Sequence, residues 1–184
     1  MSETYSGYST SNSSKNINIH QKKSKFRLLN IISSILDMMI NENKDLPNCR
    51  LLLHSQKKLV FSGISLPNFS LNDYIKRIIT YTKIEENTLI ISLIYIDKLC
   101  QLNQLILTPY NIHTLLCSAL ICAIKFNEDK TFGMSYYAEI FGVSTYELNV
   151  LEYKFIEMID FNFYINENQF VQYKNYLLKL KKMK

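Results

Sequence analysis

The stretch TPYNIHTLLCSALICAIKF, residues 108–126, decides the fold class of this 184-residue chain. Thr108 followed by Pro109 is a typical helix start, because the threonine oxygen can cap a free backbone amide and proline is preset for the first turn. Residues 99–124 contain no Lys, Arg, Asp or Glu before Lys125, which indicates a buried helix. The uninterrupted apolar run, residues 115–124, is too short to cross a bilayer. We therefore interpret this stretch as a buried helix. The helix expected from Asn87 or Thr88 is apolar nearly all round, which predicts that it is the buried central helix.

Helical patterns continue on both sides of this stretch. Apolar residues recur at steps of three and four after capping residues, which is typical of amphipathic helices. Further helices are predicted to begin at Phe26, Ser70, Asn87 or Thr88, Ser135, Ser144 and Asn166. No segment alternates as a half-buried strand does, and only 4 glycines and 3 prolines are present, which disfavours architectures with many tight turns. The sequence predicts an all-α fold.

Composition divides the chain into four segments. Residues 1–24 are rich in Ser, Thr, Asn and Lys, and are expected to form a disordered tail. Residues 25–65 are expected to hold an N-terminal helix and a connecting loop. The main helical unit is expected at residues 66–165, and a C-terminal helix with a basic tail at residues 166–184.

The distribution of charge along the chain indicates which class of partner to expect. The net charge is +5, but the basic residues concentrate in the two flanks, while acidic residues outnumber basic ones between residues 60 and 170. A nucleic-acid binder usually carries its basic stripe on the folded face, so nucleic acid is not the expected partner.

The 4 cysteines form no CxxC pair, and the first 16 residues lack an apolar signal core. These features favour a reducing, intracellular compartment, either cytoplasm or nucleus.

Residues for an enzyme active site are scarce. Of the 3 histidines, His20 falls in the predicted tail and His54 in the connecting loop. His113 and Cys117 lie one helical turn apart and could share a metal or form a Cys–His pair, but two ligands do not make a site. Ordinary core packing is the preferred interpretation of both. We therefore expect no enzyme, no metal, no cofactor and no small-molecule substrate.

Two charged residues interrupt apolar helix faces. Lys125 continues the stripe of Cys117 and Ile121, and Glu152 lies between Leu148 and Phe155 on a later helix. A charge on an apolar face is costly unless it is paired. Either the two residues meet each other or a partner's backbone, or Lys125 complements its helix end and Glu152 borders solvent.

An ordered set of motifs resembles the cyclin box. The motifs are YIKRI (74–78), YIDK (95–98), KFNED (125–129), YYAEIFGVS (136–144), ELNVLE (147–152) and IDFNFYI (159–165). The resemblance covers roughly residues 60–175, and is closest to P/U-type cyclins related to the phosphate-pathway cyclins of fungi. It implies a single five-helix cyclin box at residues 66–165, with an extra helix before it and another after it.

The resemblance also implies a function. Such proteins are regulatory subunits that bind and activate a cyclin-dependent protein kinase, forming a heterodimer. Lys125 and Glu152 match the cyclin Lys–Glu pair that hydrogen-bonds kinase backbone beside the mobile kinase C-helix. Apolar positions of the kinase-contacting surface are matched by Cys122, Phe126, Ile156, Phe161 and Phe163, for each of which core packing is the alternative. Arg77 and Asp97 match an internal structural ion pair.

Departures from the family pattern concern partner choice. Lys98 stands where the family usually has Arg, and the helix at residues 70–82 lacks the MRAIL sequence, so docking of short Arg-x-Leu substrate motifs is not expected. The alternative function is a cyclin-fold adaptor or transcription-related scaffold that does not activate a kinase. A single box and an acidic body favour the kinase regulator. The sequence does not identify the kinase, its substrates or its pathway.

Overall fold

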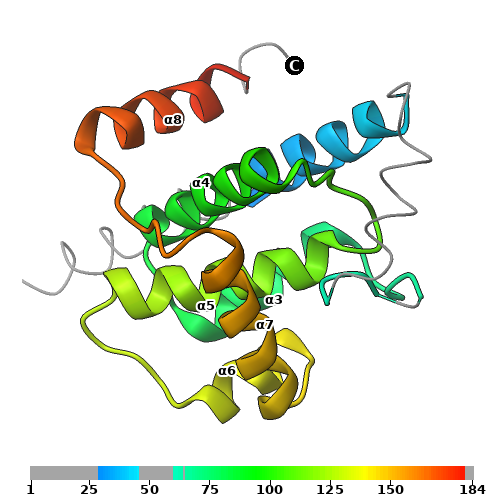
Figure 1. Ribbon diagram of the computed structural model, residues 1–184, viewed down its shortest axis with the longest axis vertical. Helices are drawn as coiled ribbons and strands as arrows, with labels where there is room; N and C mark the ends of the chain where they lie inside the picture. Colours follow the sequence, from blue (N-terminus) through cyan, green and yellow to red (C-terminus); the bar gives the residue numbers. More distant parts are fainter. Residues whose placement is uncertain (1–28, 46–59, 64, 181–184) are drawn as a thin grey trace, which may run out of the picture.

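The described part of the chain is built from helices and the loops that join them (Figure 1). The computed structural model describes residues 29–45, 60–63 and 65–180, and no strand occurs among them. A helix over residues 29–44 comes first. It is followed by α3 (Leu71–Thr82), α4 (Glu86–Asn103), α5 (Ile112–Asn127), α6 (Met134–Phe141), α7 (Thr145–Met158) and α8 (Glu167–Leu180). The all-α prediction is confirmed, with five helices, α3 to α7, between an N-terminal and a C-terminal helix.

Helix α5 is the centre of the core. Every residue from Leu115 to Ile124 is buried, as the apolar run in the sequence predicts. Helices α4 and α7 pack directly against α5, while α6 packs on α3 and α7 (Figure 1). Helix α8 contacts mainly α4, and among residues 167–179 of this helix only Leu177 is buried. Among the described helices, none is long and apolar enough to span a membrane.

The predicted start of α5 is wrong by three residues, because the N-cap is Asn111 and not Thr108. The helix begins at Ile112, and residues 108–111 form a turn instead. The buried side chain of Asn111 explains the difference. Its Oδ1 atom accepts a hydrogen bond from the Thr108 amide at 2.8 Å, and its Nδ2 atom donates to the Ile106 carbonyl at 2.9 Å. These bonds satisfy the loop backbone, so the turn competes with a helical start.

Local capping signals are confirmed. The Ser70 and Ser144 hydroxyls accept hydrogen bonds from the amides three residues later, both at 3.1 Å. Asn166 does the same at the start of α8, at 2.8 Å. Gly142 ends α6 with a φ of +78°, the left-handed conformation that glycine adopts most readily.

Helix α4 is capped by a residue far away in the sequence. It begins at Glu86, slightly before the predicted start, and its own N-cap side chain makes no capping bond. The Glu128 carboxylate, which follows α5, accepts hydrogen bonds from the Glu85 amide at 2.7 Å and from the Thr88 hydroxyl at 2.6 Å. An anion at a helix N-terminus also complements the helix dipole. This carboxylate therefore ties the start of α4 to the end of α5.

The predicted ion pair between Arg77 and Asp97 is wrong. Arg77, on the exposed face of α3, donates a hydrogen bond from Nη2 to the Glu139 carbonyl near the end of α6, at 2.5 Å. Asp97 lies on α4, and its polar neighbour is the Tyr173 hydroxyl of α8. Arg77 therefore connects α3 to α6, whereas the Asp97 side chain lies between α4 and α8. Burial raises the pKa of the Asp97 carboxyl, and the Tyr173 hydroxyl acts to lower it.

Several predictions lie outside the described residues. They concern the disordered tail at 1–24, most of the loop that ends at residue 65, the basic residues 181–184, and the side chains of His20, Cys49 and His54.

Candidate functional site

Lys125 and Glu152 form an ion pair between two helices. Lys125 lies in the last turn of α5, and its Nζ atom is 2.6 Å from Glu152 Oε1 and 2.8 Å from Oε2. The Lys125 side chain is 44% exposed, whereas that of Glu152, in the middle of α7, is 12% exposed. The carboxylate is therefore held in the protein, and the ammonium reaches toward solvent. The prediction that the two residues meet is confirmed.

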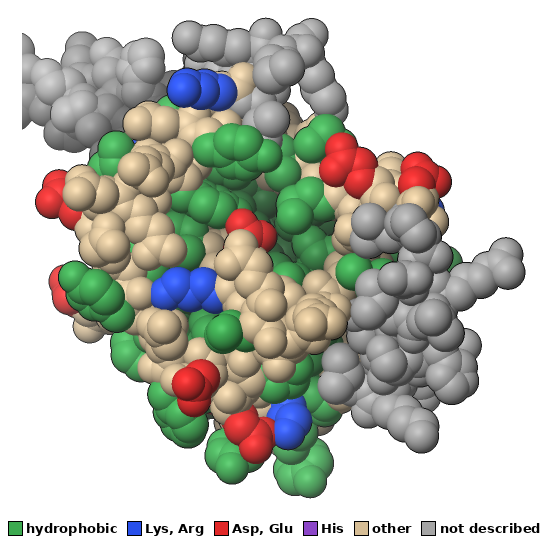
Figure 2. All heavy atoms as spheres, turned by 45° about the horizontal axis from the view of Figure 1, so that its top comes forward, with side chains coloured by type: hydrophobic (Ala, Val, Ile, Leu, Met, Phe, Trp, Pro, Cys, Tyr) green, Lys and Arg blue, Asp and Glu red, His purple; other side chains and the backbone are tan. Residues whose placement is uncertain are grey.

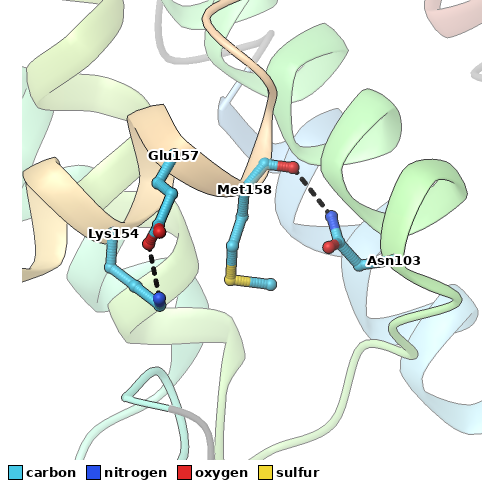
Figure 3. Close-up of polar contacts among 4 residues, drawn as sticks. All are labelled: Asn103, Lys154, Glu157 and Met158. Atoms are coloured by element: carbon cyan, nitrogen blue, oxygen red, sulfur yellow. Dashed lines mark hydrogen bonds and ion pairs between the residues drawn. The ribbon is translucent and has the colours of Figure 1, made fainter.

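A second ion pair among the described residues has a different character. Lys154 and Glu157 pair within α7, three residues apart, and their side chains are 42% and 50% exposed (Figure 3). Exposed pairs of this kind contribute little to stability. In the same view, the side-chain amide of Asn103, at the end of α4, donates a hydrogen bond to the Met158 carbonyl at 2.9 Å. This bond joins the ends of α4 and α7 (Figure 3). The pair of Lys125 and Glu152 is thus the described ion pair that joins two helices.

Exposed aromatic side chains occur at the end of α5, directly after Lys125, and in the loop between α7 and α8. Phe126 is 61% exposed, and its ring stacks on Phe163 with centroids 4.4 Å apart. Phe163 also packs edge-on against Tyr95, at 5.2 Å. Phe161 and Tyr164, in the loop between α7 and α8, are 70% and 78% exposed. Large aromatic groups left in water are the kind of anchor that protein interfaces use.

These residues border an open groove of about 730 Å³. Its walls come from the start of α4, the end of α5, the α7–α8 loop and the start of α8. They comprise Asn87, Ile91, Tyr95, Phe126, Asn127, Phe161, Phe163, Tyr164, Ile165, Glu167 and Phe170. Of the predicted contact residues, Phe126, Phe161 and Phe163 therefore lie together.

The other predicted contact residues are placed differently. Cys122 is 1% exposed, so ordinary core packing, the alternative from the sequence, describes it. Burial raises the pKa of its thiol to about 12. Ile156 is half-buried and packs against the core. Burial also raises the pKa of the free thiols of Cys100 and Cys117, as it does for Cys122.

Sequence reasoning missed how the α7–α8 loop is held. Lys98 donates to the carbonyl of Tyr164 at 2.7 Å, and Tyr95 donates its hydroxyl to the carbonyl of Phe163 at 3.1 Å. Tyr95 and Lys98 are three residues apart in YIDK, so they share one face of a helix. That spacing is the signal in the sequence. Their acceptors could not be found in it, because backbone carbonyls more than 60 residues away carry no pattern.

Cys117 is buried in the core, and His113 is half-buried beside it. The His113 ring packs against the rings of Phe69 and Tyr74, with centroids 5.4 Å and 5.0 Å apart. Burial lowers the pKa of this histidine. Within the described ranges, no group of three or more His, Cys, Asp or Glu residues could hold a metal ion.

The face that Figure 2 shows carries no continuous basic stripe. Hydrophobic side chains gather around a hollow on this face, and acidic and basic side chains are scattered about it (Figure 2). This surface suits protein contacts better than a nucleic-acid backbone, which requires clustered positive charge.

Comparisons with known proteins identify the family of this chain. The family described as Cyclin matches residues 5–163. Cyclin-U4-1 of Arabidopsis thaliana is 31% identical over 83% of this chain and 75% of its own length. Cyclin-U2-2 of the same plant is 30% identical over 84% of this chain and 69% of its own. Cyclin-P3-1 of Oryza sativa subsp. japonica is 28% identical over 91% and 68%. The family match covers all the helices from α3 to α7.

Proposed function

This chain belongs to the cyclin family, and we propose that it is a regulatory subunit that binds and activates a cyclin-dependent protein kinase. The observation that carries the proposal is the Lys125–Glu152 pair, whose carboxylate is held at two distances below 3 Å while the ammonium stays accessible. An ammonium has three N–H donors, so Lys125 can bind Glu152 and still donate to a partner's carbonyl. The protein contributes no catalytic group in this proposal.

The surroundings of the pair support a protein partner. Phe126 and Phe161 stand exposed at the groove, and could each enter a pocket of the partner. Charged hydrogen bonds at the centre of an interface become stronger when aromatic side chains around them exclude water. A stable complex of this kind buries about 1,600 Å² in total.

Activation would follow from differential binding. A rigid helical unit that contacts the kinase C-helix best in its inward position raises the population of that position. The inward position assembles the kinase Lys–Glu ion pair and the metal site. The regulatory subunit therefore changes the kinase conformation without taking part in phosphoryl transfer.

The test is copurification of the chain with each cyclin-dependent kinase of its organism, followed by phosphorylation of a generic substrate. We expect a one-to-one complex with one of these kinases and raised activity. Lys125→Met keeps the aliphatic stem but removes the donor, and should weaken binding about 30-fold, as the loss of a charged hydrogen bond predicts. Lys154→Met, which removes the other described ion pair, is the matched control and should bind as the wild type does.

Three results would overturn the proposal in part or in full. Binding without activation would favour the adaptor function. Binding that is insensitive to Lys125→Met would remove the pair from the interface. If the wild-type chain binds none of the kinases, the regulatory function is excluded.

A further inference from the structure

Two side chains on one face of α4 hold three successive carbonyls of the α7–α8 loop. The Lys98 ammonium donates to the Tyr164 carbonyl at 2.7 Å, and more weakly to the carbonyl and the side-chain oxygen of Asn162, at 3.4 Å and 3.5 Å. The Tyr95 hydroxyl donates to the Phe163 carbonyl at 3.1 Å. We call this arrangement the carbonyl clamp.

The loop needs such support, because it leaves α7 in an unfavourable backbone conformation. Asp160 and Phe161 both have a φ of 54°, in the left-handed region that bulky residues rarely occupy. Conformations of this kind persist only where the surrounding structure holds them. Local amide bonds, such as that from Phe161 to the Ile156 carbonyl at 3.1 Å, begin this turn, and the clamp holds the residues that follow.

The clamp is connected to the candidate site through ring packing. Phe163 lies against Tyr95 on one side and stacks on Phe126 on the other. Phe126 directly follows Lys125 in α5. A shift of the loop would therefore move Phe163 and disturb its stacking on Phe126, the residue next to Lys125.

We propose that Lys98 and Tyr95 are positioning residues, which place the Phe161–Tyr164 segment so that its aromatic side chains and Phe126 form one partner-binding surface. This inference rests on the proposed function for the identity of the partner. The contacts of the clamp do not depend on it. Lys98 suits the role because one ammonium can donate to several carbonyls, and an arginine, with five donors, could replace it.

The test compares Lys98→Met, Lys98→Arg and Tyr95→Phe with the control Lys76→Met, which removes an exposed lysine of α3. Hydrogen exchange of the Phe161 and Phe163 amides, both hydrogen-bonded in the turn, is measured by NMR in the free protein. We expect exchange about 10-fold faster in Lys98→Met and in Tyr95→Phe, and near wild-type exchange in Lys98→Arg and Lys76→Met. Exchange that stays unchanged in both Lys98→Met and Tyr95→Phe would overturn the clamp.

Kinase binding tests the positioning role separately. Lys98→Met should weaken the complex about 10-fold, because a loop that the clamp no longer holds must be ordered on binding. The activity of the saturated complex should stay unchanged, and Lys98→Arg should restore affinity. Faster exchange with unchanged affinity would overturn the positioning role. A wild-type chain that binds no kinase would instead overturn the proposed function, and the exchange measurement would still decide whether the clamp exists.

Discussion

Lys125 Nζ lies 2.6 Å from Oε1 and 2.8 Å from Oε2 of Glu152, although 27 residues separate the two in the sequence. The contact joins the end of α5 to the middle of α7, and the two partners differ in exposure. Because Glu152 is the less exposed partner, its carboxylate depends on Lys125 for compensation more than the reverse.

This asymmetry predicts a coupled loss of stability. Lys125→Met should lower the free energy of unfolding by about 1 kcal/mol, since it leaves a largely buried carboxylate unpaired. Combining it with Glu152→Gln removes that charge, so the double variant should be more stable than the sum of the two single changes predicts. Urea denaturation of the four proteins measures the coupling. Strictly additive changes would show that the pair contributes nothing to folding.

The cap of α4 by Glu128 should be measurable in the same way. Glu128→Ala leaves the Glu85 amide and the Thr88 hydroxyl without their acceptor, and should cost about 1–2 kcal/mol of stability. Glu128→Gln keeps an acceptor oxygen and should cost less. Asp129→Ala changes the next, exposed residue, and is expected to have little effect. Equal stability of the Glu128 and Asp129 alanine variants would contradict the cap.

Two glycines provide a matched test of backbone conformation. Gly142 has a φ of +78°, and an added Cβ would meet only the Arg77 guanidinium, at 4.0 Å. Gly142→Ala should therefore lower the free energy of unfolding by about 1 kcal/mol, because alanine is strained in the left-handed conformation. Gly133 has a φ of −68°, and an added Cβ would meet only the Ser135 hydroxyl oxygen, at 3.9 Å, which is an ordinary van der Waals contact. Gly133→Ala should therefore be neutral or slightly stabilising. Thermal unfolding that lowers both melting temperatures equally would argue against this explanation.

Asp97 should make stability depend on pH. Burial raises its folded pKa above the ordinary value of 3.8, so ionisation is harder in the folded state than in the unfolded state. The contribution of Asp97 is fully present below pH 3.8, and is lost as pH rises through the folded pKa. Compared with Asp97→Asn, the wild-type protein should therefore lose more stability over that window. Urea denaturation from about pH 3.5 to 7 checks this, and parallel curves for the two proteins would refute it.

Tyr173→Phe extends the same prediction. The Tyr173 hydroxyl acts to lower the pKa of Asp97, so its removal should raise that pKa further and widen the window of lost stability. The carbon resonance of the Asp97 carboxyl, followed by NMR during a pH titration, reports the change directly. A pKa of Asp97 that falls in Tyr173→Phe would show that the hydroxyl does not bond the carboxylate.

The helices and most of their ends could be read from the sequence. Ser70, Ser144, Asn166 and Gly142 were all found because each acts on backbone within a few residues. The Lys125–Glu152 contact was also within reach, since each residue interrupts an apolar stripe. The ordered motifs carried the family, because they combine local pattern with spacing.

Long-range polar contacts were decided by the tertiary structure alone. Glu128 reaches α4 across 43 residues, and Lys98 reaches the Tyr164 carbonyl across 66. Arg77 contacts a carbonyl of α6, which no side-chain pattern predicts, and Asn111 folds a turn where the sequence favoured a helix start. Local propensity and hydrophobic period place helices, because they act within a turn or two of the chain. Which carbonyls, carboxylates and rings then meet depends on how those helices pack.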